Sequence, residues 1–397
     1  MALRFKTLLV LAVLASLLSF AKFSHCEGSN WATPDQYIHA CYSDLPSLFG
    51  ARGLDKHVWP YASDKNSVEY PVLTGLVMFA TSGLVETPLS YFNLNAFLLA
   101  LIFIFLVLLT AKLKPEFSYL LPVAPAMLAS LYINWDLWAI ITMMLAIYWF
   151  DRKAYLYSSL ALGISIATKF LPIFLLFPII FILWRSNRVK ELIKYVVITA
   201  LVWIGINVPF VLTTPTGWWR FYKLNIERVA DWGSVWLALN QLGVGLTNLN
   251  YLSLLLLLIG LAAIALFLFE IKNTPTLASV AFIVLAVVMV ASKVYSPQYV
   301  LWLTPLAVIA LTNKKDLYAF WLWQSVEVMY HVAIWQHLAV VTGAHFGLPQ
   351  GGYAALTLLR SAGSLYLVGV LAKRALQARN TQGSAFDLLF EASKAYP

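Results

Sequence analysis

Apolar runs of membrane-spanning length recur along almost the whole chain, and they limit what it can fold into. They begin at the first residues and continue to about residue 373, so no stretch between them is long enough for a soluble domain. Only 11% of the residues are charged, against about 25% in soluble domains, and 61% are hydrophobic. The sequence therefore predicts an all-α, multi-pass membrane protein and excludes a cytosolic enzyme with a membrane anchor.

The basic residues indicate orientation in the membrane and not a nucleic-acid partner. Lys and Arg number 27 against 18 Asp and Glu, but they sit in short loops between the apolar runs. Such loops carry Lys and Arg mainly on the cytoplasmic side of a membrane. Their distribution predicts about twelve spans, with both termini in the cytoplasm.

Three apolar segments do not have the length of a single membrane span. The stretch 118–150 is too long for one span and is broken at Asp136, and the stretch 155–184 is broken at Lys169, so each is predicted as a hairpin of two short spans. The segment 71–85 is too short to span and is predicted as a re-entrant or interfacial helix, because counting it as a span would place most basic residues outside. The remaining spans are read directly at residues 5–23, 91–111, 193–212, 250–270, 276–292, 298–312, 317–341 and 353–372.

The loops place any chemistry on the outer face. Residues 1–373 form one transmembrane domain, followed by a cytoplasmic tail at 374–397, and the cytoplasmic loops are too short for a nucleotide-binding domain. Neither GxGxxG nor GxxxxGK[ST] occurs in the sequence. Polar residues gather instead in two outer segments, 24–90 and 213–249.

Two residue pairs carry structural expectations. Cys26 and Cys41 both fall in the first outer segment, where a disulfide is chemically permitted, and two unlinked thiols are the alternative. Glu327 and Arg360 are charges in mid-span at similar estimated depth, so we expect them to form an ion pair between the last two spans. The first apolar run resembles a signal peptide, but we expect it to be retained as a span.

Asp44 and Asp136 are the outer acids best suited to chemistry. Each lies among aromatic and apolar residues, where a carboxylate is costly to desolvate unless something uses it. Among the outer cations, Lys169 and Lys293 both adjoin spans and helix-breaking prolines, so each could aim an ammonium at a phosphate near the lipid headgroups. Snorkelling of these side chains to the interface is the alternative.

Several motifs, taken together in order and spacing, resemble the actinobacterial membrane glycosyltransferases of family 87. They cover most of residues 24–310, and they are Cys41-Tyr42-Ser43-Asp44-Leu45-Pro46, Gly50-Ala51-Arg52-Gly53, Val68-Glu69-Tyr70-Pro71-Val72-Leu73-Thr74-Gly75, Asn134-Trp135-Asp136-Leu137, Ala167-Thr168-Lys169-Phe170-Leu171-Pro172, Gly217-Trp218 leading to Arg228, Asp231 and Ser234, and Ser296-Pro297-Gln298-Tyr299 with Trp302.

The resemblance implies a GT-C fold in the plasma membrane and a polyprenyl-phosphate-linked sugar, typically mannose, as donor on the outer face. The acceptor would be a glycan or glycolipid, and the sugar would be transferred with inversion. Asp44 corresponds to the first-loop acid usually regarded as general base, with Asp136 as an orienting or second acid. Because Leu45 follows Asp44, a metal site built from adjacent carboxylates is not expected, and no cofactor is predicted. The candidate substrate-binding residues are Arg52, Glu69, Lys169, Arg228, Asp231, Lys293 and Gln298.

A transporter or flippase of a lipid-linked sugar is the competing class. It would share the hydrophobicity and the polar outer segments of this sequence. Transporters usually place polar residues near the midplane in repeated halves, whereas this sequence shows no internal repeat and one possible midplane pair. A non-catalytic assembly scaffold is a third reading.

Overall fold

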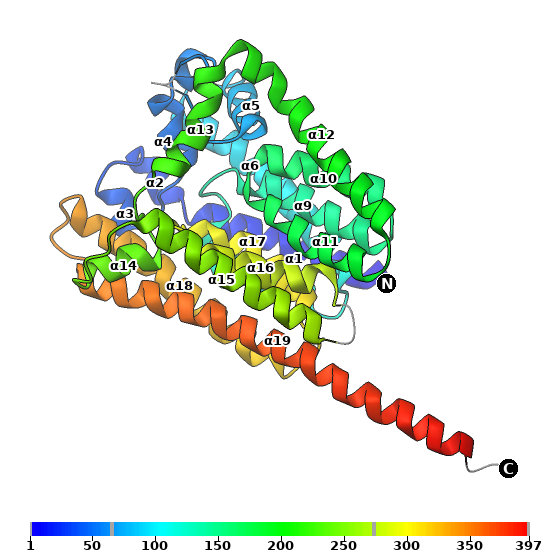
Figure 1. Cartoon of the computed structure of the whole chain (residues 1–397). Coiled ribbons are helices and arrows are strands. Elements are labelled where there is room, and N and C mark those ends of the chain that lie inside the picture. Colours follow the sequence, from blue (N-terminus) through cyan, green and yellow to red (C-terminus); the bar gives the residue numbers. More distant parts are fainter. Residues whose placement is uncertain (1, 64–66, 272–274, 395–397) are drawn as a thin grey trace.

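The computed structural model describes residues 2–63, 67–271 and 275–394, and every regular element in these ranges is a helix (Figure 1). In chain order the helices are α1 (Ala2–Ala21), α2 (Ser24–Ser29), α3 (Asp35–Ile38), α4 (Asp44–Ala51), η1 (Leu54–Lys56), α5 (Val72–Ser82), α6 (Pro88–Leu113), α7 (Leu120–Val123), α8 (Pro125–Ser130), α9 (Asp136–Asp151), α10 (Tyr155–Thr168), η2 (Leu171–Leu175), α11 (Leu176–Arg185), α12 (Val189–Thr213), α13 (Pro215–Glu227), α14 (Val235–Gln241), α15 (Leu249–Glu270), α16 (Leu277–Ala291), η3 (Pro297–Tyr299), α17 (Val300–Ala310), α18 (Asp316–Val341) and α19 (Gln350–Lys394).

Five helical segments in the described ranges are long and apolar enough to cross a membrane, which makes the chain a multi-pass membrane protein. The predicted count of about twelve spans is not confirmed. Helix α16, for example, has 15 residues and reaches only about 22 Å, less than the hydrocarbon thickness of about 30 Å. The five segments are Phe5–Ser29, Pro88–Leu113, Val189–Thr213, Leu249–Glu270 and Gln350–Leu376.

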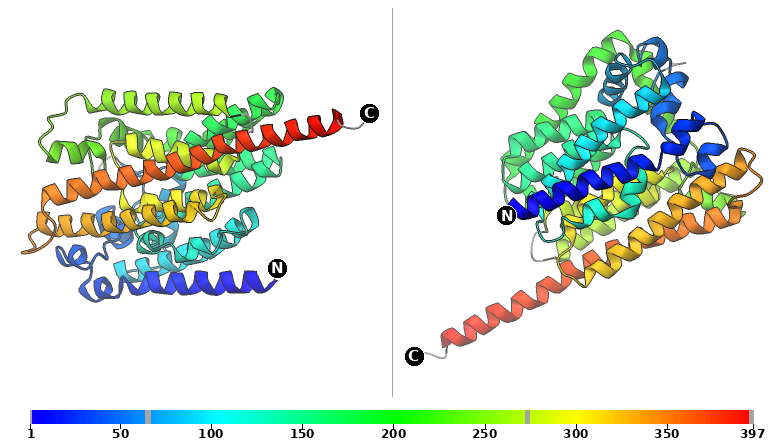
Figure 2. Two further views of the ribbon diagram at one scale, coloured as in Figure 1. Left: turned by 90° about the horizontal axis from the view of Figure 1, so that it is seen from below. Right: turned by 180° about the vertical axis from the view of Figure 1, so that it is seen from behind.

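The long helices α1, α15, α18 and α19 run alongside one another, and the short helices α2, α3, α4 and α14 gather at one end of them (Figures 1 and 2). Helix α16 lies at the centre, because almost all of its side chains are buried and it contacts α15, α17 and α19. Helices α12 and α15 expose most of their apolar side chains, as expected for lipid-facing helices. Helix α19 pairs with α18 and then continues beyond the bundle to Lys394, so the predicted tail at 374–397 is helical over its described part.

The helical structure is interrupted at both predicted positions, Asp136 and Lys169. Helix α9 begins at Asp136, after the short helices α7 and α8, and α10 ends at Thr168 so that Lys169 is in extended conformation. The segment 71–85 contains only the 11-residue helix α5, too short to cross a membrane. These breaks matter because each brings a polar side chain to the same end of the bundle.

The first outer segment is closed on itself and held against the second. A disulfide links Cys26 and Cys41, the pairing that the sequence left open. Tyr61 then fills the space between α5 and α13, where a Cβ on Gly75 would lie 2.1 Å from its hydroxyl oxygen and one on Gly217 would lie 2.0 Å from its carbonyl oxygen. The absence of a side chain at Gly217 therefore lets α13 approach the first outer segment, and its absence at Gly75 leaves room for the Tyr61 hydroxyl.

Glu327 and Arg360 form the predicted ion pair. The Nε of Arg360 lies 2.8 Å from a carboxylate oxygen of Glu327, and both side chains are at most 1% exposed. The guanidinium also donates to the carbonyl oxygens of Tyr295 and Ser296, and it lies over the ring of Tyr330 at 4.2 Å. The pair thus holds the non-helical segment between α16 and η3 against α18 and α19.

Breaking this pair should destabilise the protein more than removing it. Glu327→Gln leaves a buried guanidinium without its counter-charge, a loss of about 3–5 kcal/mol in free energy of unfolding, whereas adding Arg360→Gln should restore part of that loss. Thermal unfolding in phospholipid nanodiscs measures the effect. If the double variant is no more stable than the less stable single variant, the two charges are not energetically coupled.

The predicted orientation can be tested at two exposed positions, one in the first outer segment and one just beyond the C-terminal end of α9. That helix has 16 residues, about 24 Å, so Lys153 just beyond it lies far from the end of the bundle that holds Asp136. Both His57 and Lys153 are exposed. A membrane-impermeant maleimide applied to intact cells should label His57→Cys and not Lys153→Cys, and the reverse result would place both termini outside.

Candidate active site

A cavity of about 380 Å³ lies where the two outer segments meet η3 and the C-terminal third of α18. Its wall includes six of the residues singled out from the sequence, which are Asp44, Glu69, Lys169, Arg228, Asp231 and Gln298. Arg52, Asp136 and Lys293 are not on the wall and contact wall residues or their neighbours instead. Residues more than 200 positions apart in the sequence therefore form one polar site.

Asp44 is fixed by its own backbone at the start of α4. Ser43 caps the helix by accepting a hydrogen bond from the Leu45 amide, and its hydroxyl donates to the carbonyl oxygen of Tyr132 at 2.7 Å. The Asp44 amide donates to the carbonyl oxygen of Ile133 at 2.7 Å. These bonds attach the start of α4 to the loop before α9, so the carboxylate cannot move independently of that loop.

Two tyrosines hold the Asp44 carboxylate. The Tyr42 hydroxyl donates to Oδ1 at 2.8 Å, and the Tyr70 hydroxyl donates to Oδ2 at 3.0 Å. Burial raises the pKa of the Asp44 carboxyl, while the two hydroxyls and the positive charge of Lys169 oppose that rise. Asp44 is thus a carboxylate with raised proton affinity in a cavity that admits a ligand, as a general base requires.

Asp136 lies behind the cavity wall and positions Lys169. Its Oδ1 is 2.7 Å from the Lys169 ammonium, and its Oδ2 accepts a hydrogen bond from the indole of Trp302 at 2.8 Å. The side-chain oxygen of Asn134 accepts a hydrogen bond from the Asp136 amide at 3.0 Å, in the turn that leads into α9. Asp136 is 1% exposed with both oxygens engaged, so the structure gives it a positioning contact and no access to a ligand.

Lys169 occupies the gap between α10 and η2 and faces the cavity. Its ammonium lies 4.6 Å from the centre of the Tyr70 ring, in addition to its ion pair with Asp136. Burial alone would lower the pKa of Lys169, but the negative charge of Asp136 and the further attraction of Tyr299 and Asp44 raise it. The lysine is therefore a permanent cation on the wall.

Glu69 links the two outer segments across the cavity. It accepts hydrogen bonds from Arg52 at 2.5 Å and from Arg220 of α13 at 3.1 Å. Arg52, predicted to bind substrate, is therefore engaged behind Glu69. The bridge matters for the site because α13 leads directly to Arg228.

Arg228 and Lys293 have different surroundings although both were predicted to clamp a phosphate. Arg228 lines the cavity and pairs with Asp231 at 3.1 Å. Lys293 accepts a hydrogen bond from the Asp231 amide through its carbonyl oxygen, but its ammonium donates to Ile226 and to Asn250, outside the cavity wall. Arg228 is the better placed of the two to contact a ligand.

An apolar pocket of about 430 Å³ adjoins the polar cavity. Lys169, Phe221 and Tyr299 line both, so the two spaces meet at the lysine. The rest of the pocket wall comes mainly from η2, α13, α15 and α16, with Phe170, Phe174, Trp219, Tyr222, Leu257 and Val288 among its residues. A ligand with a charged group and a long apolar chain matches this pair of spaces.

Sequence reasoning did not assign several of the wall residues. Tyr42 and Tyr70 fall inside the matched motifs, where a signal existed, but their hydroxyls were given no role. Trp335 lies in an apolar helix more than 290 positions from Asp44, and nothing local in the sequence marks it.

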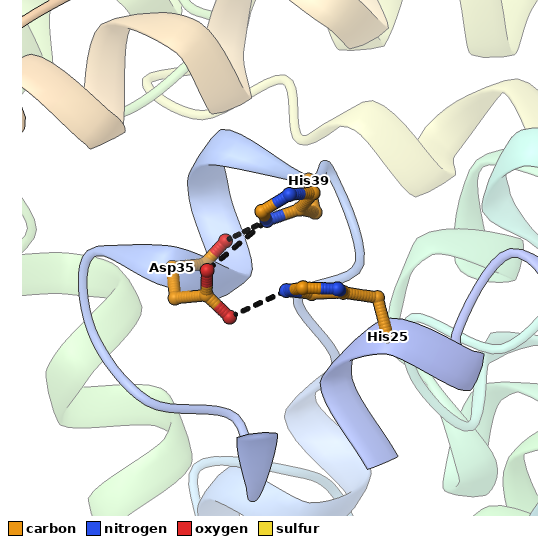
Figure 3. A group of neighbouring side chains, drawn as sticks. All are labelled: His25, Asp35 and His39. Carbon is orange, nitrogen blue, oxygen red and sulfur yellow. Dashed lines mark hydrogen bonds and ion pairs between the residues drawn. The ribbon is translucent and has the colours of Figure 1, made fainter. Parts of the chain in front are cut away.

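A cluster of His25, Asp35 and His39 lies at the disulfide and is the one group of potential metal ligands found in the described part of the chain (Figure 3). Asp35 pairs with His25 at 2.8 Å and with His39 at 3.1 Å. The two imidazole rings are stacked with centres 3.6 Å apart and planes 27° apart, and both point at the Asp35 carboxylate (Figure 3). The possible ligand atoms of the three side chains all lie within 4.8 Å of one another.

No protein-family model matches this sequence, and no curated protein matches it. Among solved structures, it is similar to ArnT from Cupriavidus metallidurans in the crystal structure bound to undecaprenyl phosphate. The two chains are 13% identical with a TM-score of 0.46, and the match covers 95% of this chain and 78% of that chain. A likeness at 13% identity and this TM-score does not define a family.

Proposed function

We propose that the protein is a membrane glycosyltransferase of the GT-C type, which transfers a sugar from a polyprenyl-phosphate donor to an acceptor with inversion. The observation that carries this proposal is Asp44, a carboxylate of raised pKa in a cavity whose wall also holds Lys169 and Arg228. Mannose is the proposed sugar, by the family resemblance of the motifs, and the outer face of the plasma membrane is the proposed location.

The donor would lie across the junction of the two spaces. Its lipid chain would fill the apolar pocket, and its phosphate would lie beside Lys169, which lines both. An ammonium has three donors, and only one of those of Lys169 is used by Asp136, so others can reach phosphate oxygens. Arg228 would supply a second positive charge from the second outer segment, 213–249.

The reaction needs one base and stabilisation of one anion. The acceptor hydroxyl would give its proton to Asp44 while its oxygen attacks the anomeric carbon of the donor sugar. The bond between that carbon and the phosphate oxygen breaks, and polyprenyl phosphate leaves as an anion that Lys169 and Arg228 stabilise. A single displacement inverts the anomeric carbon. Asp44 then releases its proton to water.

A transporter or flippase of a lipid-linked sugar is less well supported by the contacts. Transport sites use polar groups near the midplane that can release a substrate. Here the mid-span charges Glu327 and Arg360 are paired with each other, and Arg360 also bonds backbone carbonyls, so both are committed to structure.

Substituting Asp44 tests the proposed chemistry directly. Asp44→Asn keeps the side-chain volume but removes its basicity, so sugar transfer should fall by a factor of about 10² to 10⁴. Membranes incubated with radiolabelled polyprenyl-phosphate-mannose, followed by extraction of labelled products, measure the effect. The exposed acid Asp55, in the same outer segment, provides the matched control as Asp55→Asn and should remain active. Normal transfer by a folded Asp44→Asn variant would exclude Asp44 as the general base.

The pH dependence of transfer should report the pKa of Asp44. Its base form is required, so the rate falls as the pH drops through that pKa. The Tyr70 hydroxyl lowers the pKa, hence Tyr70→Phe should raise it and shift the acid limb of the kcat/KM profile to higher pH, with little change above that limb. Tyr91→Phe removes another buried hydroxyl, one bonded to the Met78 carbonyl, and should leave the limb in place. An unshifted limb in Tyr70→Phe would exclude Asp44 as the titrating base.

A further inference from the structure

Three side chains of the first outer segment meet at a point away from the polar cavity (Figure 3). Asp35 begins α3, His39 follows the last residue of that helix, and His25 belongs to α2. Each oxygen of the Asp35 carboxylate faces one imidazole, because Oδ2 lies 2.8 Å from the Nε2 of His25 and Oδ1 lies 3.1 Å from the Nδ1 of His39. None of the three residues lines the cavity, so the cluster is a separate feature.

The covalent structure of the chain holds these side chains together. Cys26 directly follows His25, and Cys41 lies two positions after His39, so the disulfide keeps the two histidines close. The His39 amide also donates to the carbonyl oxygen of Asp35 at 3.1 Å, which fixes the spacing of these two residues. A ligand set that is already assembled loses little conformational entropy when an ion binds.

Two imidazole nitrogens and a carboxylate oxygen form a donor set that suits Zn²⁺. Zinc sites with three protein ligands of these kinds hold water in the fourth position. Bonds of about 2.0–2.1 Å in a tetrahedral site place the ligand atoms about 3.3 Å apart, so the two observed pairs need to open only slightly. A ring nitrogen that faces a carboxylate offers its lone pair to an ion when the ring proton is on the other nitrogen.

The exposure of the cluster favours a ligand site over a contact that only stabilises the fold. The side chains of His25, Asp35 and His39 are 47%, 33% and 44% exposed, so an ion can reach them and keep a water ligand. Ion pairs between side chains this exposed contribute little to stability. Stability therefore does not account for the convergence of two of the chain's six histidines on one carboxylate.

We infer that His25, Asp35 and His39 bind a Zn²⁺ ion through Nε2, the carboxylate and Nδ1, with water at the remaining position. The two cysteine sulfurs are joined to each other, so the ligands are nitrogen and oxygen atoms only. The inference is independent of the proposed transfer reaction.

The ion is structural, because it links α2 to α3 beside the disulfide. Helix α3 carries Tyr37 to the cavity wall, and the carbonyl oxygen of Ile38 accepts a hydrogen bond from Gln336 of α18 at 3.0 Å. Zinc at the cluster thus stabilises the segment that precedes Asp44 and packs against α18.

Zinc binding is measured with the full chain in phospholipid nanodiscs, after histidine tags have been removed from the protein and the scaffold. Equilibrium dialysis against ZnCl₂ followed by metal analysis gives the stoichiometry and the Kd, and thermal unfolding with and without ZnCl₂ gives the change in Tm. The variants are His25→Gln, Asp35→Asn and His39→Gln. His57→Gln is the matched control, since His57 is an exposed histidine of the same outer segment and lies outside the cluster.

Wild-type protein and His57→Gln should each bind one Zn²⁺ and unfold at a higher Tm in its presence. Each cluster variant should bind Zn²⁺ at least about tenfold more weakly and lose the rise in Tm. MgCl₂ at the same concentration should not raise the Tm, because Mg²⁺ requires oxygen ligands. The substituted side chains are partly exposed, so the variants should fold, and their Tm without zinc checks this.

Two results would overturn the zinc site. One is a wild-type protein that binds no Zn²⁺, and the other is binding that persists unchanged in folded His25→Gln and His39→Gln or that is lost equally in His57→Gln. Since neither donor nor acceptor is present in these measurements, their failure leaves the transferase proposal intact.

Discussion

The ion pair between Asp136 and Lys169 is the contact on which the site depends. Burying a carboxylate and burying an ammonium each cost on the order of several kcal/mol in desolvation, which the ion pair and its hydrogen bonds must offset. Trp302 supplies the remaining hydrogen-bond donor to Asp136. The pair joins the start of α9 to the break after α10. It thereby fixes Lys169 beside Tyr70, and through Tyr70 it reaches Asp44. Removing either charge would strand the other inside the helix bundle.

The second buried pair solves a similar problem on the other side of the cavity. The segment from Ser292 to Ser296 is not helical, and its carbonyl groups need partners where water is scarce. Arg360 donates to two of these carbonyls while Glu327 balances its charge. The adjacent η3 then presents Gln298 and Tyr299 to the cavity. Both breaks thus combine irregular backbone with a buried ion pair, and the polar wall is built at these breaks.

The candidate site was only partly predictable from the sequence. Motifs and local charge predict Asp44, Lys169 and Arg228 as site residues, and all three line one cavity. The same signals predict Lys293, but its ammonium bonds Asn250 outside the wall. An identical argument from a nearby proline and span boundary applied to both lysines, so only their tertiary neighbours distinguish them.

The sequence by itself determined that the chain is an all-helical, multi-pass membrane protein, that its helices break at Asp136 and Lys169, and that Glu327 pairs with Arg360. These features follow from local hydropathy and from the cost of an uncompensated charge in an apolar span. A charged residue within an apolar run can be recognised in the sequence without knowledge of its tertiary neighbours. Tertiary structure alone decided the disulfide, the two tyrosines on Asp44 and the contact between Tyr42 and Trp335 at the cavity wall. Those contacts join segments far apart in the chain, and their geometry depends on how the helices pack, which hydrophobic periodicity does not encode.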